Sequence, residues 1–281
     1  MSDADPDYDP AAEAEKAARI VATEPDNPVA WFNLGLAHKY LGNWRQCAEA
    51  NLRALAISSE PEDPAWWNLG IAATALRDWA LARRAWRGYG IEDSKLGEGS
   101  DPIRLDWNIS PVRIRSTTGD RVEVVWGTRL CPARIRIDSI PYPASEHRWG
   151  DIVLHDGAPN GERTIGEVVY PVFDELERWS PSEIPTLRAN VRCGDDDDVL
   201  ALIDLFRDAR FDAEDWSTSV RELCKECSEG RPDGHEHAFP EAGEERVFGL
   251  AAPLGLAARV LRTWRDASPA SRDFEEPVPV G

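Results

Sequence analysis

Four side chains that could bind a metal ion lie close together in the C-terminal third of the chain: Cys224, Cys227, His235 and His237. Two cysteines separated by two residues can place both thiolates on one ion across a tight turn. Two histidines at positions i and i+2 of an extended segment point to the same side. The pattern predicts a tetrahedral Zn²⁺ site. Four protein ligands would leave no open position for a reactive water, so we expect a structural zinc.

Other interpretations of this Cys/His cluster stay open. The seven-residue gap between Cys227 and His235 is shorter than in a zinc finger, so the cysteines could be a reduced or redox pair and the histidines part of a solvated loop. A redox role is disfavoured because the pair does not open a helix after a strand, as it does in thioredoxin-like folds. If one ligand were absent, a nearby glutamate could act as the base of a metal-dependent hydrolase, the candidates being Glu226, Glu229 and Glu236.

Few other residues have the spacing of a catalytic site. His147 and the neighbours His155 and Asp156 have no serine or cysteine partner at a recognisable distance in the sequence, and we expect them to be turn residues. The run 195–198 consists of four aspartates but lacks the spaced oxygen ligands of a calcium loop. Its place before a helical pattern predicts helix capping.

The elements that must position the Cys/His cluster belong to residues 184–281. Alternating and helical patterns predict six elements, at 186–193 (strand), 199–206 (helix), 216–220 (strand), 247–250 (strand), 254–264 (helix) and 274–278 (strand). The order β-α-β-β-α-β is that of the ferredoxin-like sandwich. We therefore predict an α+β domain that carries the cluster as an insertion at 224–237.

Residues 107–183 alternate with period two and predict a small antiparallel, barrel-like β domain. The β-branched runs lie at 112–115, 122–126, 133–137 and 151–154. Thr118-Gly119-Asp120 predicts a hairpin between the first two runs. Alternating arginines form a basic stripe without interleaved aromatic residues, which is typical of the solvated face of a sheet and not of a nucleic-acid site: Arg113, Arg115, Arg134 and Arg136.

The first third of the chain contains an internal repeat. The segment 31–35, Trp-Phe-Asn-Leu-Gly, returns at 66–70 as Trp-Trp-Asn-Leu-Gly, which gives a period of 35 residues. Small residues at Gly35 and Gly70 would let two helices approach closely while tryptophan and leucine fill the seam between them. Residues 11–23 match the second half of a unit and predict a capping helix.

The repeat resembles the tetratricopeptide repeat, whose pattern combines a Trp, a Leu-Gly pair, an aromatic residue on the second helix and a closing Pro. The resemblance implies an all-α array of helical hairpins over residues 1–95, followed by a linker at 96–106. The sequence departs from the family in its extra residue of spacing, in His38 and Ala73 where Tyr is usual, and in Arg77 at the position of Gly42 in the first copy.

In this family the first helix of each unit lines a concave groove. The resemblance therefore implies seven partner-binding positions, Phe32, Leu36, Lys39, Tyr40, Trp67, Ile71 and Thr74. These residues would either bind a peptide or helix of a partner or pack against the next domain. Asn33 and Asn68 stand where some members of the family grip a peptide carboxylate.

The bulk composition limits the classes of function. Fifty-one acidic and 32 basic residues give a net charge of −19, which repels nucleic acids and anionic lipids. The chain has no run of about twenty apolar residues, and its acidic start does not resemble a secretory leader. Five cysteines, an odd number, fit reduced thiols better than a disulfide framework. We expect a cytoplasmic protein that binds neither membranes nor nucleic acid.

A binding function is the leading hypothesis because the sequence contains no catalytic triad, phosphate-binding glycine loop or dinucleotide fingerprint. We expect an adaptor that captures a protein or peptide partner, and not an enzyme. A narrower version is an immunity or antitoxin-like protein whose acidic surface covers a basic toxin. The metal-dependent hydrolase is the remaining alternative.

Overall fold

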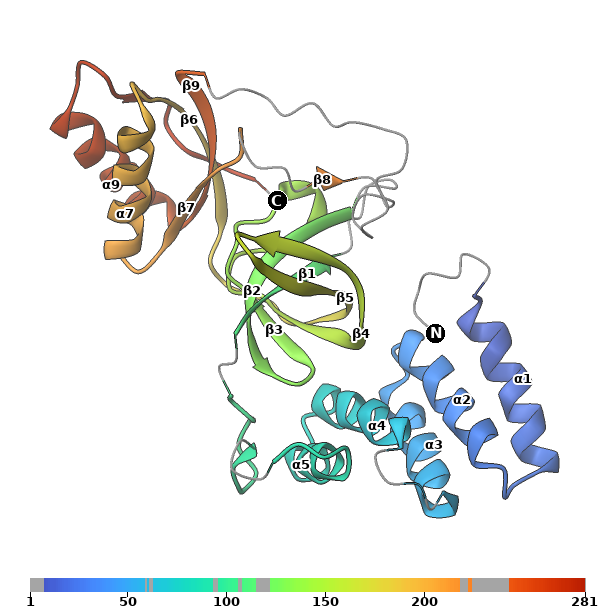
Figure 1. Cartoon of the computed structure of the whole chain (residues 1–281). Coiled ribbons are helices and arrows are strands. Elements are labelled where there is room, and N and C mark those ends of the chain that lie inside the picture. Colours follow the sequence, from blue (N-terminus) through green and yellow to red (C-terminus); the bar gives the residue numbers. More distant parts are fainter. Residues whose placement is uncertain are drawn as a thin grey trace.

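The computed structural model describes residues 8–58, 60, 63–92, 96–105, 108–114, 122–217, 222–223 and 243–280. Within them, a helical region is followed by a mixed sheet and then by an antiparallel sheet with two helices (Figure 1). The general prediction, helices first and sheets afterwards in a multidomain chain, is confirmed. The domain limits drawn from the sequence stay predictions. None of the described helices is long and apolar enough to cross a membrane.

The helical region consists of five helices: α1 (Pro10–Thr23), α2 (Pro28–Tyr40), α3 (Trp44–Ile57), α4 (Pro64–Ala75) and α5 (Trp79–Gly88). Each helix contacts the next one along the chain. The two copies of the repeat therefore fold as the helix pairs α2/α3 and α4/α5, and α1 packs on the first pair as a cap (Figure 1).

The start of each repeat follows from its local sequence. Asn27 precedes Pro28, and the Asn27 side-chain oxygen accepts a hydrogen bond from the amide of Ala30 at 3.1 Å. Asp63 caps α4 in the same way, ahead of Pro64. Proline costs no hydrogen bond at the first helical position, because the amide of that residue would lack a partner within the helix. The repeated Asn/Asp-Pro pair thus fixes where the first helix of each pair begins.

The turn inside each helix pair contains one residue in the left-handed region. This residue is Gly42 in the first copy, with φ of 69°, and Arg77 in the second, with φ of 60°. The left-handed conformation costs a non-glycine residue roughly 1–2 kcal/mol. The Arg77 guanidinium lies over the Trp179 ring of the mixed sheet, 4.0 Å from its centroid. This cation–π contact offsets part of the cost and explains how the second copy tolerates arginine.

The helical region packs on the mixed sheet through one shared apolar cluster. The cluster joins residues of α4 and α5, residues of the following segment and residues of the sheet, namely Ile71, Ala73, Trp79, Ala82, Trp86, Leu96, Ile103, Cys131 and Ala133. Leu96 and Ile103, which belong to the predicted linker at 96–106, are only 2% and 1% exposed. The described part of this segment is therefore packed against both regions and is not a free connection.

Arg83 of α5 holds the same segment through its side chain. The guanidinium donates hydrogen bonds to the carbonyl oxygens of Leu96, Gly97, Gly99 and Asp101, at 3.1, 3.2, 2.9 and 2.8 Å. An arginine offers five N–H donors in a fixed plane, so one buried side chain can replace the hydrogen bonds that these carbonyls would lack in an irregular segment.

The mixed sheet has the order β1-β5-β4-β3-β2-β8, and β1 also pairs with β2. Its strands are β1 (Ile109–Ile114), β2 (Val122–Cys131), β3 (Arg134–Ile137), β4 (Ile152–Ile165), β5 (Val168–Ser180) and β8 (Glu222–Leu223). The pairs from β1 to β5 are antiparallel except β1 with β5, which runs parallel and closes the ring of strands. The prediction of a purely antiparallel domain is wrong for this closing pair.

The predicted basic stripe is also wrong in part. Arg113 and Arg134 are 8% and 3% exposed, so they do not face solvent. Arg113 pairs with Asp174, and Arg134 donates to the Ile103 carbonyl oxygen and lies over the Trp79 ring, 4.6 Å from its centroid. The side chains of Arg113 and Arg134 thus bind other parts of the protein and do not form a solvated stripe. Arg136 is half-exposed, and Arg115 lies outside the described residues.

The antiparallel sheet has the order β10-β6-β9-β7, and β11 pairs with β6 beside β10. The elements follow one another as β6 (Thr186–Arg192), α7 (Asp196–Asp208), β7 (Asp212–Asp215), β9 (Glu245–Ala251), α9 (Leu254–Ala267), β10 (Asp273–Phe274) and β11 (Val278–Pro279). Strand β7 precedes the strand expected at 216–220; Trp216 and Ser217 are not in a strand, and 218–220 lie outside the described residues. Three of the four β7 residues are acidic. Acidic residues have a low β propensity, so the sequence does not predict this strand.

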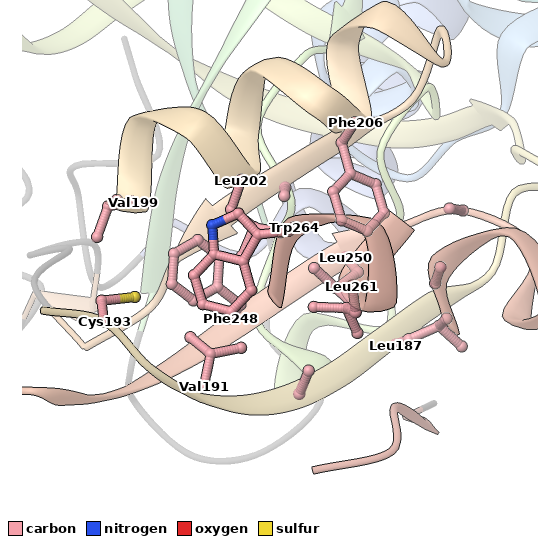
Figure 2. Close-up of a cluster of buried hydrophobic side chains, with 14 residues drawn as sticks. Leu187, Val191, Cys193, Val199, Leu202, Phe206, Phe248, Leu250, Leu261 and Trp264 are labelled. Atoms are coloured by element: carbon pink, nitrogen blue, oxygen red, sulfur yellow. The ribbon is translucent and has the colours of Figure 1, made fainter. Parts of the chain in front are cut away.

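Both helices of this unit cover one face of the sheet (Figure 2). Leu202 and Phe206 of α7 and Leu261 and Trp264 of α9 lie over four strand residues, Leu187, Val191, Phe248 and Leu250. The aspartate run behaves as expected, because Asp195 caps α7 by accepting a hydrogen bond from the amide of Asp198 at 2.9 Å.

Substitution of Gly70 tests the close packing of α4 on α5. A Cβ at this position would lie 2.5 Å from ring atoms of the fully buried Trp86. We expect Gly70→Ala to lower the free energy of unfolding by about 1–3 kcal/mol, measured by urea unfolding. Gly255→Ala on α9 is the control, because its Cβ would meet nothing within 4 Å. We expect the control to be neutral or slightly stabilising; equal effects of the two substitutions would contradict the packing.

Candidate functional site

The four predicted metal ligands, Cys224, Cys227, His235 and His237, lie outside the described residues. Among the residues that the structure does describe, no group of three or more His, Cys, Asp or Glu side chains is placed to hold a metal ion. The structural zinc and the hydrolase alternative therefore stay predictions.

Five of the predicted partner-binding residues line one cavity of about 360 Å³: Phe32, Leu36, Lys39, Tyr40 and Trp67. We call it the α2–α4 cavity, because it lies between these two helices and β4 of the mixed sheet. Its other lining residues are Asn33, Pro64, Asn68, Tyr89, Asp156, Gly157 and Ala158. The volume falls in the range of pockets that hold small molecules or a few side chains, roughly 300–1,000 Å³.

Ile71 and Thr74, the other two predicted partner-binding residues, do not line this cavity. Both have an exposed fraction of 0%. Ile71 packs in the apolar cluster with Trp79 and Trp86, and the Thr74 hydroxyl donates to the carbonyl oxygen of Gly70 at 2.7 Å. In this arrangement neither side chain has surface that a partner could contact, and their role in partner binding stays a prediction.

A buried ion pair joins the helices to the sheet at the cavity. The Lys39 ammonium lies 3.0 and 2.9 Å from the two carboxylate oxygens of Asp156, and the side chains are only 4% and 8% exposed. The Tyr40 hydroxyl donates to Asp156 at 2.9 Å, and the amide of Gly157 donates at 2.6 Å. Burial alone would raise the pKa of Asp156, but Lys39 and these hydrogen bonds outweigh it and hold the pKa below its usual range.

Trp67 forms the contact between α4 and β4. A Cβ at Gly157 would lie 1.7 Å from the Trp67 Nε1 atom, so only glycine lets β4 come this close. Trp67 also makes edge-on contacts with the rings of Trp86 and Tyr89, at 5.1 and 4.7 Å between centroids. Its buried Nε1 atom has no hydrogen-bond partner in the described part of the chain.

The two interpretations of the groove residues thus apply to different side chains. Lys39, Tyr40 and one side of Trp67 bind β4, which is the packing role against the next domain. Phe32 and Leu36 line the open part of the cavity and are half-buried. This apolar part of the cavity is open to another molecule.

The histidine and aspartate residues expected in turns are buried instead. His155 is 0%, Asp156 6% and His147 8% exposed. His155 Nδ1 lies 2.7 Å from the Asp156 carbonyl oxygen, and complete burial followed by the charge of Arg129 lowers the pKa of His155 to about 3. The sequence carries no local signal for these roles because the partners are distant; Lys39 and Asp156 are 117 residues apart.

Removing Lys39 tests the ion pair. Lys39→Met leaves the buried Asp156 carboxylate without a counter-charge, and we expect it to lower the free energy of unfolding by about 3–5 kcal/mol. The double variant Lys39→Met/Asp156→Asn should recover most of this loss. Lys16→Met is the control, because the Lys16–Glu13 pair is 62% and 41% exposed and should contribute less than about 1 kcal/mol. The free energies of unfolding are measured with urea. Equal losses in Lys39→Met and Lys16→Met would contradict a buried pair.

His155 predicts a pH dependence of stability. Its pKa of about 3 in the folded protein is below the ordinary value of 6.5, so the unfolded chain binds the proton more readily. The contribution is fully present above pH 6.5 and is lost as the pH falls toward 3, by up to roughly 1.4 kcal/mol per pH unit. We expect wild type to lose more stability than His155→Phe over this range in urea unfolding. Parallel pH curves would contradict a buried neutral imidazole.

Comparisons with known proteins add little to this geometry. No protein-family model and no curated protein matches the chain. One similar solved structure is described as a novel crystal structure of a hypothetical protein from Neisseria gonorrhoeae. It shares 14% identity over 62% of this chain and 94% of its own, with a TM-score of 0.25. At this level of similarity it carries no argument about fold or function.

Proposed function

We propose that this protein is an interaction adaptor that binds an extended peptide segment of a partner in the α2–α4 cavity. The observation that carries the proposal is the apolar, open part of the cavity, where Phe32, Leu36 and Trp67 border about 360 Å³ of space. A partner side chain that filled this space would cover the remaining exposed apolar surface of the three residues. Each Å² of apolar surface removed from water contributes roughly 25 cal/mol.

The polar groups of the cavity favour a peptide over a charged small molecule. Asp156 neutralises Lys39, so this pair offers no free charge to a ligand. Asn33 and Asn68 also line the cavity, and an amide side chain carries both a donor and an acceptor, as a peptide backbone does. Recognition would then combine an apolar anchor with hydrogen bonds to the backbone of the partner.

The net charge of the chain indicates which residues should flank the apolar anchor of the partner segment. A net charge of −19 attracts basic residues and repels acidic ones at a distance. We infer a partner segment with an apolar anchor and basic flanks. A basic toxin would satisfy this description, which keeps the immunity or antitoxin-like form as a special case of the same function.

We also propose a fold family for the helical region and for the last unit, and a cellular location. The 35-residue period and the successive helix pairs support a tetratricopeptide-type array. The strand order β10-β6-β9-β7, with both helices on one face of the sheet, supports the ferredoxin-like class for the last unit. A cytoplasmic location is supported by Cys47, Cys131 and Cys193, which are buried, free thiols among the described residues.

A peptide selection tests the proposed function. Random peptides displayed on phage are selected against the full chain, and fluorescence anisotropy measures the Kd of the strongest binder. We expect Leu36→Glu to weaken binding at least about tenfold, because an unpaired charge would occupy the apolar cavity. Leu200→Glu on α7, at a side chain 57% exposed, is the matched control and should bind like wild type. Selected peptides that bind both variants equally would place recognition elsewhere and overturn the proposal.

A further inference from the structure

A second and larger cavity, of about 470 Å³, lies where the mixed sheet meets the antiparallel sheet. Residues after β3, the end of β5 and the two residues that follow it contribute one side. Thr186 at the start of β6 and Val280, which follows β11, contribute the other. Cavities between two packed units are common sites for small ligands. None of its lining residues belongs to the α2–α4 cavity, so any ligand here would be independent of the adaptor function.

One guanidinium at this cavity has no partner. Arg148 lines the cavity and is half-buried, yet its side chain makes no hydrogen bond or ion pair with the residues that the structure describes. Arg178, at the end of β5, already donates to the Glu146 carbonyl oxygen at 2.5 Å and lies 3.9 Å from Asp151. Among the described residues, Arg148 is therefore the lining cation without a partner and is available to a ligand.

A buried hydroxyl at the same cavity also lacks a partner. Thr186, the first residue of β6, is 5% exposed, and its Oγ1 atom has no hydrogen-bond partner in the described part of the chain. Burial of an unpaired hydroxyl is unfavourable. Thr186 lines the cavity, and its hydroxyl can occupy different staggered positions by rotation about χ1. A ligand with an acceptor atom would satisfy it.

The acidic groups around the cavity limit the charge of the ligand. The two carboxylate oxygens of Asp151 already accept hydrogen bonds from the amides of Arg148 and Ser182, at 2.9 and 2.5 Å. Glu175 lies 2.8 Å from the Nε2 atom of the buried His147, and Glu146 is exposed at the rim. Asp151, Glu175 and Glu146 offset the charges of Arg148 and Arg178, so the described residues give the site little net positive charge. This favours a ligand with one negative charge over a phosphate dianion.

His147 also lines the cavity but offers no free base to a ligand. Its Nδ1 atom lies 2.8 Å from the Ser145 carbonyl oxygen while Nε2 lies 2.8 Å from Glu175. Both ring nitrogens are thus engaged by the protein, so neither is free to accept a proton from a ligand.

We propose that this cavity binds a small organic monocarboxylate, whose carboxylate pairs with the Arg148 guanidinium and accepts a hydrogen bond from the Thr186 hydroxyl. A planar guanidinium matches a carboxylate with two parallel hydrogen bonds. Pro143, Pro181 and Val280 complete the lining and offer apolar surface to a short hydrocarbon or aromatic body.

The test uses the full chain with sodium butanoate and sodium benzoate as probes. Saturation-transfer NMR detects binding, and calorimetry gives the Kd. Butanamide and inorganic phosphate are the comparison ligands, because the first lacks the charge and the second carries too much. We expect at least one carboxylate to bind more tightly than both comparison ligands and to raise the Tm of the protein.

Two variants and one control identify the site. Arg148→Gln should weaken carboxylate binding about tenfold, and Thr186→Val, which removes the hydroxyl but keeps the shape, about fivefold. Arg259→Gln on the exposed side of α9 changes the net charge equally and should bind like wild type. Circular dichroism and Tm confirm that each variant is folded, and Arg148→Lys, with the charge but not the planar fork, should give an intermediate Kd.

Several outcomes would overturn the proposal. They are a wild-type protein that binds neither carboxylate, tighter binding of phosphate or butanamide, and Arg148→Gln and Arg259→Gln variants with the same Kd. Because the Leu36→Glu variant leaves this cavity unchanged, it should bind the carboxylate like wild type, which separates a failure here from a failure of the adaptor proposal.

Discussion

A buried charge is stable only when its counter-charge sits within hydrogen-bond distance, and this requirement governs how the first two regions of the chain meet. Lys39 and Asp156 come from α2 and β4, are almost completely shielded from water, and share a single ion pair to which Tyr40 adds a hydrogen bond. A shift of β4 by a few ångström would leave both charges desolvated and unpaired. The close approach of Gly157 to the Trp67 ring is compatible with one docked position only.

The packing of β4 against the helices limits how much of the inner surface of the repeat is left uncovered. A helical array alone would present its whole inner surface to a partner, whereas here the sheet occupies part of it. Tyr40 and Lys39 are committed to β4, while Phe32 and Leu36 border open space. The α2–α4 cavity is therefore composite, with two helices and one strand as walls. Its character is mainly apolar because the strongest charges next to it cancel each other.

The sequence predicts what is local and periodic. The Trp-Gly repeat and its Asn/Asp-Pro caps mark α2 and α4, and alternation marks β6. Features that depend on distant partners carry no such signal. Arginines at 113 and 134 look like a solvated face until Asp174 and Trp79 are placed beside them, and the parallel pairing of β1 with β5 joins segments far apart in the chain. Strand β7 pairs through its backbone, but its acidic side chains have a low preference for strands, so the sequence does not predict it. The groove positions and their two possible roles, partner binding or packing against the next domain, could be predicted by resemblance, but which of them β4 covers could not.

The hydrogen bonds of Arg83 to the segment after α5 have a mechanical consequence. A change of backbone angles within 96–101 would break several hydrogen bonds to one guanidinium together. This part of the connection is therefore held against α5 in a defined conformation. A preformed wall of this kind loses little free energy to reorganisation when a ligand binds beside it.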